Sequence, residues 1–155
     1  MSRCCFFWSL QLLHKAVTPW WRLLHGALGN TSRLNHWNPN RFPSPLCSVY
    51  GSEAEMQYHM FVDCSFEWSY WEAYLAQVNL SEVFPTPTSL WQALISLTSE
   101  DNVRYQNKIL LSVGAGLAAL WHYHWFCFFE EELWNPIRTL NLCLGKLQHT
   151  NLIVA

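Results

Sequence analysis

Hydrophobic residues recur along most of this chain at spacings of three and four positions, and no long stretch alternates between hydrophobic and polar residues. The residues Trp68, Trp71, Leu75 and Val78 show this spacing clearly. Such a period places the hydrophobic side chains on one face of an α-helix. The pattern therefore predicts a mainly α fold.

Prolines and capping residues divide the pattern into successive helices. The expected helices are residues 10–28 with a break or kink at Pro19, a short helix to Trp37 capped by Asn30 or Thr31, a helix capped by Ser65, a helix capped by Thr88, a long helix from near Asp101, and a last helix opened by Asn135 and Pro136. Each carries a hydrophobic face, so we expect the helices to share one core.

Residues 38–52 interrupt this helical pattern. They are rich in turn formers, among them Pro43, Pro45 and Gly51, and they predict a loop. We expect a knuckle-like loop, with room for a short β-hairpin, near residues 42–64.

The sequence Pro85-Thr86-Pro87 predicts a stiff linker. This linker divides the chain into a domain at residues 1–84 and a C-terminal helical tail at residues 85–155. We expect the tail to pack on the domain, because its helices also carry hydrophobic faces.

The composition favours a folded chain with an adhesive surface. Among the 155 residues, 51% are hydrophobic, 13% are charged and ten are tryptophan. A disordered chain has the opposite composition. So little charge leaves few groups to keep the surface solvated.

Charge is distributed unevenly along the chain. Residues 1–46 contain five basic and no acidic residues, residues 47–100 contain seven acidic and no basic residues, and the remainder is balanced. Such asymmetry can mark a nucleic-acid-binding face in the first third. The basic and acidic segments can equally pack side by side and cancel, since five charges are few for phosphate binding.

The cysteines indicate a reducing environment. They stand at positions 4, 5, 47, 64, 127 and 143, without the spacing of a small disulfide-rich secreted domain, and no clean signal peptide is recognisable. We therefore expect an intracellular location, in the cytoplasm or nucleus, with thiols that are free or bound to metal.

One segment carries candidate metal chemistry. Eleven residues separate Cys47 from His59, and Cys64 follows just before an expected helix. Zinc is held tetrahedrally by thiolate and imidazole groups, commonly one pair from a tight turn and one pair near a helix. A turn pair would need cysteine at position 44, where the chain has Ser44, and a neutral hydroxyl is a poor zinc ligand. Candidates for the fourth ligand are His36, Asp63 and Cys127.

Two other interpretations of this segment remain open. Buried cysteine and histidine side chains among aromatic residues can serve packing alone. A three-ligand site can also be an open catalytic site, for which Glu55 is the nearest candidate general base.

The residues around this segment follow the pattern of a known family. They are Trp21, Leu24, His25, Gly26, Leu28, Thr31, Arg33, Leu34 and Trp37, followed by Pro45, Leu46, Cys47, Glu55, His59, Met60, Phe61, Cys64 and Trp71. Over about residues 18–75 this pattern resembles the reverse-transcriptase zinc-binding domain of non-LTR (LINE-type) retrotransposons. In that family the module follows the polymerase and carries a Cys-Cys-His-Cys ligand set.

The resemblance implies zinc as the cofactor, with Cys47, His59 and Cys64 as ligands. Ser44 stands in the place of the first cysteine of the set. The resemblance also implies that residues 1–84 are the zinc-binding-like domain. We expect a degenerate copy or fragment of a retrotransposon protein, without activity of its own.

The resemblance further implies an ancestral role in holding template RNA or target DNA near the polymerase. For this contact we expect Arg22, Arg33 and Arg41, with Trp37 as a stacking platform. No small-molecule substrate is expected. An alternative function is a helical protein-interaction or membrane-associated protein without metal, in which residues 6–8 and 121–129 would be exposed.

Several further motifs bear on an enzymatic or membrane function. Gly114-Ala115-Gly116-Leu117-Ala118-Ala119 fits a dinucleotide-binding fingerprint, but helical periodicity runs through it, and close helix packing explains it better. Residues 109–129 are long enough to span a bilayer. Their hydrophobic residues form a stripe on one face of the helix, however, and the segment contains histidines, so a buried core helix is favoured. With Asp63 and Asp101 as its only aspartates, the chain lacks the carboxylate cluster of two-metal nucleotidyl transfer. We therefore expect no enzyme.

Overall fold

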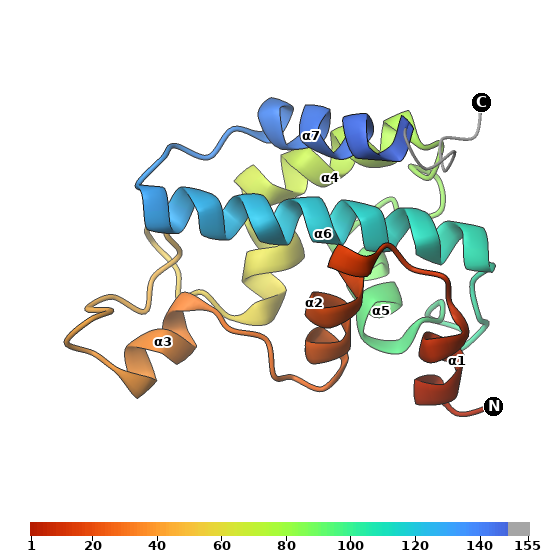
Figure 1. Cartoon of the computed structure of the whole chain (residues 1–155), viewed down its shortest axis with the longest axis horizontal. Helices are drawn as coiled ribbons and strands as arrows, with labels where there is room; N and C mark the ends of the chain where they lie inside the picture. The colour runs from red at the N-terminus through yellow and green to blue at the C-terminus, as the bar shows by residue number, and fades with distance from the viewer. Residues whose placement is uncertain (149–155) are drawn as a thin grey trace.

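The computed structural model describes residues 1–148, which form helices joined by loops (Figure 1). The helices are α1 (Arg3–Ser9), α2 (His14–Leu24), α3 (Thr31–Trp37), the short π-helix η1 (His59–Asp63), α4 (Ser65–Gln77), α5 (Pro87–Ser96), α6 (Asn107–Glu130) and α7 (Pro136–Gln148). In this part of the chain, β pairing is limited to two isolated antiparallel bridges, Leu46 with Ala54 and Thr98 with Arg104. The predicted mainly α fold is confirmed.

The long helix α6 runs through the middle of the molecule (Figure 1). It packs against α2 on one side and α7 on the other, while α4 contacts α7 and η1. Helix α3 and the loop that follows it lie near the C-terminal end of α6, far from the N-terminus of the chain. The candidate metal segment is therefore placed at one end of the molecule.

Buried aromatic side chains hold this arrangement together. Trp20 and Trp71 are 0% exposed, and their indole N–H groups donate to the carbonyl oxygens of Leu94 and Phe61 at 2.8 and 2.7 Å. Because the one polar atom of each indole is satisfied, these rings bury large areas without leaving a donor unpaired. The second bond also ties α4 to η1.

Two glycines of α6 allow its neighbours to approach closely. A Cβ atom at Gly116 would lie 2.6 Å from the ring of Tyr74 and 2.7 Å from that of Trp71, and one at Gly114 would lie 3.0 Å from Trp20. Both glycines lie inside α6, so no turn for a phosphate forms there. The interpretation of this motif as close helix packing is confirmed.

Two predicted helix starts were wrong. Helix α5 begins at Pro87 and is capped by Thr86 through a capping box, so the cap is not Thr88. The proline fits the first helical position because its missing N–H has no partner there. Helix α6 begins at Asn107 rather than near Asp101, because residues 98–104 form a turn closed by a β-bridge.

The other boundaries follow the prediction more closely. Asn30 caps α3, and Asn135 accepts bonds from the first turn of α7. The expected break at Pro19 is wrong, because Pro19 is buried inside α2 and the non-helical residues 10–13 lie before that helix. Cys64, not Ser65, is the N-cap residue of α4.

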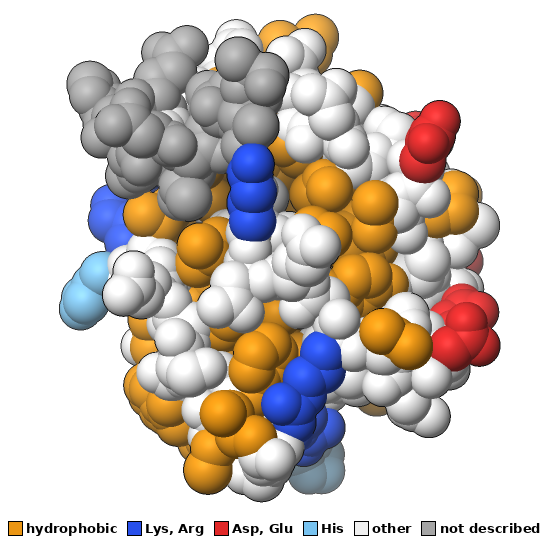
Figure 2. All heavy atoms as spheres, turned by 90° about the vertical axis from the view of Figure 1, so that its right-hand side faces the viewer, with side chains coloured by type: hydrophobic (Ala, Val, Ile, Leu, Met, Phe, Trp, Pro, Cys, Tyr) orange, Lys and Arg blue, Asp and Glu red, His pale blue; other side chains and the backbone are white. Residues whose placement is uncertain are grey.

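Hydrophobic side chains also reach the surface. Figure 2 views the end of the molecule that carries the N-terminus, where they are interspersed with uncharged groups. Of the aromatic run at residues 6–8, Phe7 is 1% exposed and Trp8 is 58% exposed. The hydrophobic core extends from Phe7 to Leu147, and the expected division at residue 84 stays a prediction.

The described helices include none that combines the length and apolarity needed to cross a membrane. Residues 109–129, which are long enough to span a bilayer, lie within α6, where most side chains are buried against neighbouring helices.

Candidate metal centre

Cys47 lies in a tight loop between α3 and η1. Its backbone N–H donates to Glu53 O at 2.7 Å, and its carbonyl accepts from Gly51 N at 2.8 Å. Gly51 has φ +80°, which a residue without a side chain adopts readily. With the bridge between Leu46 and Ala54, the loop forms the short hairpin-like turn expected near residues 42–64.

His59 and Cys64 lie at the two ends of η1. The backbone N–H of Cys64 donates to His59 O at 2.9 Å, five residues back, which closes the wide π turn. Residues 59–62 are all buried, so the turn is anchored by hydrophobic side chains. This anchoring places the imidazole and the second thiol at fixed positions just before α4.

The structure brings the three predicted ligands together. One ligand atom from each of Cys47, His59 and Cys64 lies within 4.8 Å of the other two, and all three residues are buried. Two thiols and an imidazole from a turn and a helix start are the donor set that zinc prefers.

The donors also suit a cation chemically. Nε2 of the buried His59 has no hydrogen-bond partner in the described part of the chain, and such an unpaired buried atom is rare unless it has a function. A hydrogen bond from the Cys64 thiol lowers the pKa of Cys47 to about 5, against the effect of burial. A thiolate at Cys47 is therefore available near neutral pH, and zinc coordination deprotonates a thiol outright. The residues fit a zinc ion.

Two carboxylates lie on the Nδ1 side of His59. The distances from Nδ1 are 3.2 Å to Glu53 Oε2 and 3.6 Å to Asp63 Oδ2. Burial alone would lower the pKa of His59, but Cys47 and these carboxylates raise it. Carboxylates beside a metal-binding histidine commonly orient its ring and fix its tautomer.

The position of the fourth ligand is not filled by a strong donor. Ser44 is exposed, and its Oγ accepts the N–H of Leu46 at 3.2 Å. Of the three substitutes considered, His36 and Cys127 do not join the ligand cluster, and Asp63 lies beside His59 instead. The thiol of Cys127 points to Leu133 O at 3.8 Å.

Sequence reasoning missed a buried group of charges beside the centre. His124 Nδ1 lies 2.5 Å from Glu67 Oε1, and His124 Nε2 lies 3.4 Å from Glu55 Oε2. All three side chains are 0% exposed. Glu55, which was considered as a general base, also accepts the Thr31 N–H at 2.9 Å, so its contacts are those of a structural group.

The three ionisable side chains of this group shift one another's pKa values. Burial raises the pKa of Glu67 to about 7, against the attraction of His124. Burial acts on Glu55 in the same direction, but contact with His124 lowers the pKa of that carboxyl. The two carboxylates in turn raise the pKa of His124 well above its usual value, although burial opposes this. The two carboxylates therefore favour the charged form of the ring.

The residues expected to contact nucleic acid lie on α2, on α3 and in the loop after α3. Arg22 is exposed at the end of α2, and Arg41 is exposed in the following loop, over the ring of Phe42 at 5.4 Å. Arg33 lies over the ring of Trp37 at 5.1 Å, and that ring is 63% exposed.

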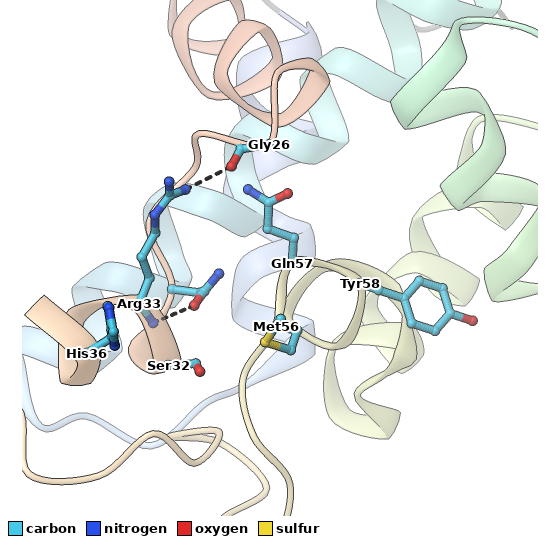
Figure 3. Close-up of a pocket in the computed structure, with 8 residues that line it drawn as sticks. Gly26, Ser32, Arg33, His36, Met56, Gln57 and Tyr58 are labelled. Carbon is cyan, nitrogen blue, oxygen red and sulfur yellow. Dashed lines mark hydrogen bonds between the residues drawn. The ribbon is translucent and has the colours of Figure 1, made fainter.

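A cleft of about 590 Å³ lies beside Arg33. Its walls are α3 and the chain at Met56–Tyr58, as Figure 3 shows. The Arg33 guanidinium donates to Gly26 O at 2.8 Å, and the Gln57 amide faces the same space, whereas the Tyr58 ring points away. The cleft therefore offers a fixed cation and an amide.

The N-terminal part of the chain is similar to a known protein family. Residues 1–71 match the family model described as zinc-binding in reverse transcriptase. No curated protein and no solved structure was found that matches the chain. The match begins earlier than the resemblance seen at about residue 18 and ends within α4, so α5, α6 and α7 lie outside it. The segment at residues 1–71, which contains all three clustered metal donors, thus matches the family of reverse-transcriptase zinc-binding domains.

Proposed function

We propose that this chain is a non-catalytic zinc-binding module in which one zinc ion holds the loop at residues 44–58 against the start of α4. The observation that supports this most strongly is the convergence of Cys47, His59 and Cys64 within 4.8 Å. Residues 17 positions apart in sequence meet there, and the family match covers all three.

In this proposal Cys47 and Cys64 bind as thiolates and His59 binds as a neutral imidazole. The zinc ion supplies a crosslink between the hairpin-like loop and the helix start, as in structural zinc sites. A water molecule takes the fourth position, because the hydroxyl of Ser44 is a poor donor. The ligand charges balance the charge of the ion, so its burial leaves no net charge at the centre.

The protein, purified under reducing conditions with zinc, is expected to contain about one zinc ion per chain. Cys47→Ala and His59→Ala are expected to reduce this content to near zero, because two remaining donors hold the ion weakly. Elemental analysis after desalting measures the content. Cys5→Ala, which removes an exposed thiol from α1, is the matched control and should keep it. Wild type without zinc, or variants that keep it, would contradict the proposal.

For the ancestral partner we propose single-stranded nucleic acid, held at the face formed by α3 and the cleft beside it. Arg33 supports this, because its guanidinium is held in place by Gly26 O and by the Trp37 ring. A cation fixed beside an exposed indole suits a phosphate and a stacked base on the same strand.

Arg33→Ala is expected to weaken binding of a single-stranded RNA oligonucleotide about tenfold at low salt. It should also reduce the slope of log affinity against log salt by about 0.7, the value for one lost phosphate contact on a single strand. Fluorescence anisotropy over a salt series measures both quantities. Arg138→Ala on α7 removes an equal charge from another surface and should have little effect. Equal losses in the two variants would indicate attraction by general charge alone.

A further inference from the structure

We propose that His124 is a positioning residue of the metal centre, which clamps together the two chain segments that carry Cys47 and Cys64. This inference rests on the proposed zinc binding. His124 lies on α6, outside the family match at residues 1–71. The C-terminal part of the chain would therefore complete the metal-binding module.

The first segment is held through Glu55. The backbone N–H of Glu55 donates to Pro45 O at 2.9 Å, two residues before Cys47. Its side chain accepts the N–H of Thr31 at 2.9 Å and lies 3.4 Å from His124 Nε2. Fixing Glu55 therefore fixes the end of the hairpin-like turn that carries the first thiol.

The second segment is held through Glu67. Contact with Cys47 and burial raise the pKa of the Cys64 thiol, whereas the hydrogen bond from the Glu67 backbone N–H to its sulfur lowers that pKa. The Glu67 side chain meets His124 Nδ1 at 2.5 Å. Because one residue supplies both contacts, the position of the Cys64 sulfur is tied to the position of the His124 ring.

The two contacts use opposite sides of a single ring. Nδ1 faces the segment of Cys64 and Nε2 faces the segment of Cys47, so the width of the imidazole sets the spacing between these segments. A planar, fully buried ring carried by α6 has little freedom to change that spacing. The two thiols are thereby held at a separation that suits one cation.

The burial of these groups supports a positioning role. An uncompensated buried charge is strongly destabilising, and a well-packed hydrophobic group would often serve stability as well as a buried ion pair. Here an imidazole and two carboxylates are all 0% exposed, and both carboxylates lie in segments that present thiols. Fixed geometry at the neighbouring site accounts for a group that stability alone would not require.

His124→Gln is expected to weaken cobalt(II) binding about tenfold, the lower end of the range seen when groups that orient metal ligands are removed. Cobalt(II) serves as the probe because its visible absorption reports tetrahedral coordination by thiolates. The variant should also show a changed absorption spectrum at saturating metal, since its thiols are less well placed. A loss of stability alone would leave the saturated spectrum unchanged.

His122→Gln is the matched control, because it makes the same chemical change two residues away on an exposed position of α6. It should bind cobalt(II) as wild type does. If His124→Gln fails to fold, Glu67→Gln provides the same test with a side chain of equal shape, and the same tenfold loss is expected.

The possible failures are distinguishable. Wild type that binds no cobalt(II) or zinc would overturn the proposed function and this inference with it. Wild type that binds the metal, together with His124→Gln or Glu67→Gln variants of unchanged affinity and spectrum, would overturn this inference alone.

Discussion

Ser44→Cys is expected to increase the zinc affinity of the protein about thirtyfold, which corresponds to ~2 kcal/mol. A structural site with four ligands binds zinc with about 10–16 kcal/mol, so each ligand contributes roughly 3 kcal/mol, less the loss of a bound water. The substitution creates a Cys-x-x-Cys turn with Cys47 and restores the ligand that the family pattern contains. Competition with a chromophoric chelator measures the affinity.

Ser52→Cys is the control for this prediction, since it places a thiol at another exposed position of the same loop. It should leave the affinity unchanged. If Ser44→Cys also leaves it unchanged, position 44 does not reach the metal, and the turn at Pro45 and Leu46 differs from that of the family's four-ligand site.

Gly116→Ala is expected to lower the free energy of unfolding by about 3 kcal/mol. The added methyl group would lie 2.6 Å from the Tyr74 ring and 2.7 Å from the Trp71 ring. Neither ring can move easily, because the Tyr74 hydroxyl donates to Ser112 O at 2.6 Å and the Trp71 indole to Phe61 O at 2.7 Å. The clash therefore forces α6 away from α4.

Urea unfolding followed by tryptophan fluorescence checks this value. The matched control is Gly145→Ala on α7, where an added Cβ meets no atom within 4 Å. There the better helix propensity of alanine should raise the free energy of unfolding by about 1 kcal/mol. Two changes of equal sign would contradict the close packing of α6 against α4.

Local signals in the sequence were sufficient for much of the fold. Hydrophobic spacing of three and four predicted the helices, and Asn30 and Asn135 marked helix starts that the structure shows. The start of α6 was misplaced because Val103 lies seven positions before Leu110 and so continues the hydrophobic spacing of the helix. No local signal in the sequence predicts the bridge between Thr98 and Arg104, which keeps this segment out of the helix.

The metal donors could be predicted from the sequence because turn residues flank Cys47 and a helix follows Cys64. The group formed by Glu55, His124 and Glu67 could not, since His124 and Glu67 are 57 residues apart. A histidine in an apolar helix resembles an ordinary core residue. The signal that was available is the placement of Glu67 three positions after a candidate ligand, in a helix with hydrophobic neighbours.

The central claim is that Cys47, His59 and Cys64 bind one zinc ion together. X-ray absorption at the zinc edge of the reconstituted protein tests it most directly. We expect a first shell with two sulfur atoms at about 2.3 Å and nitrogen or oxygen neighbours at about 2.0–2.1 Å. A first shell without sulfur, or a protein that retains no zinc, would contradict the claim.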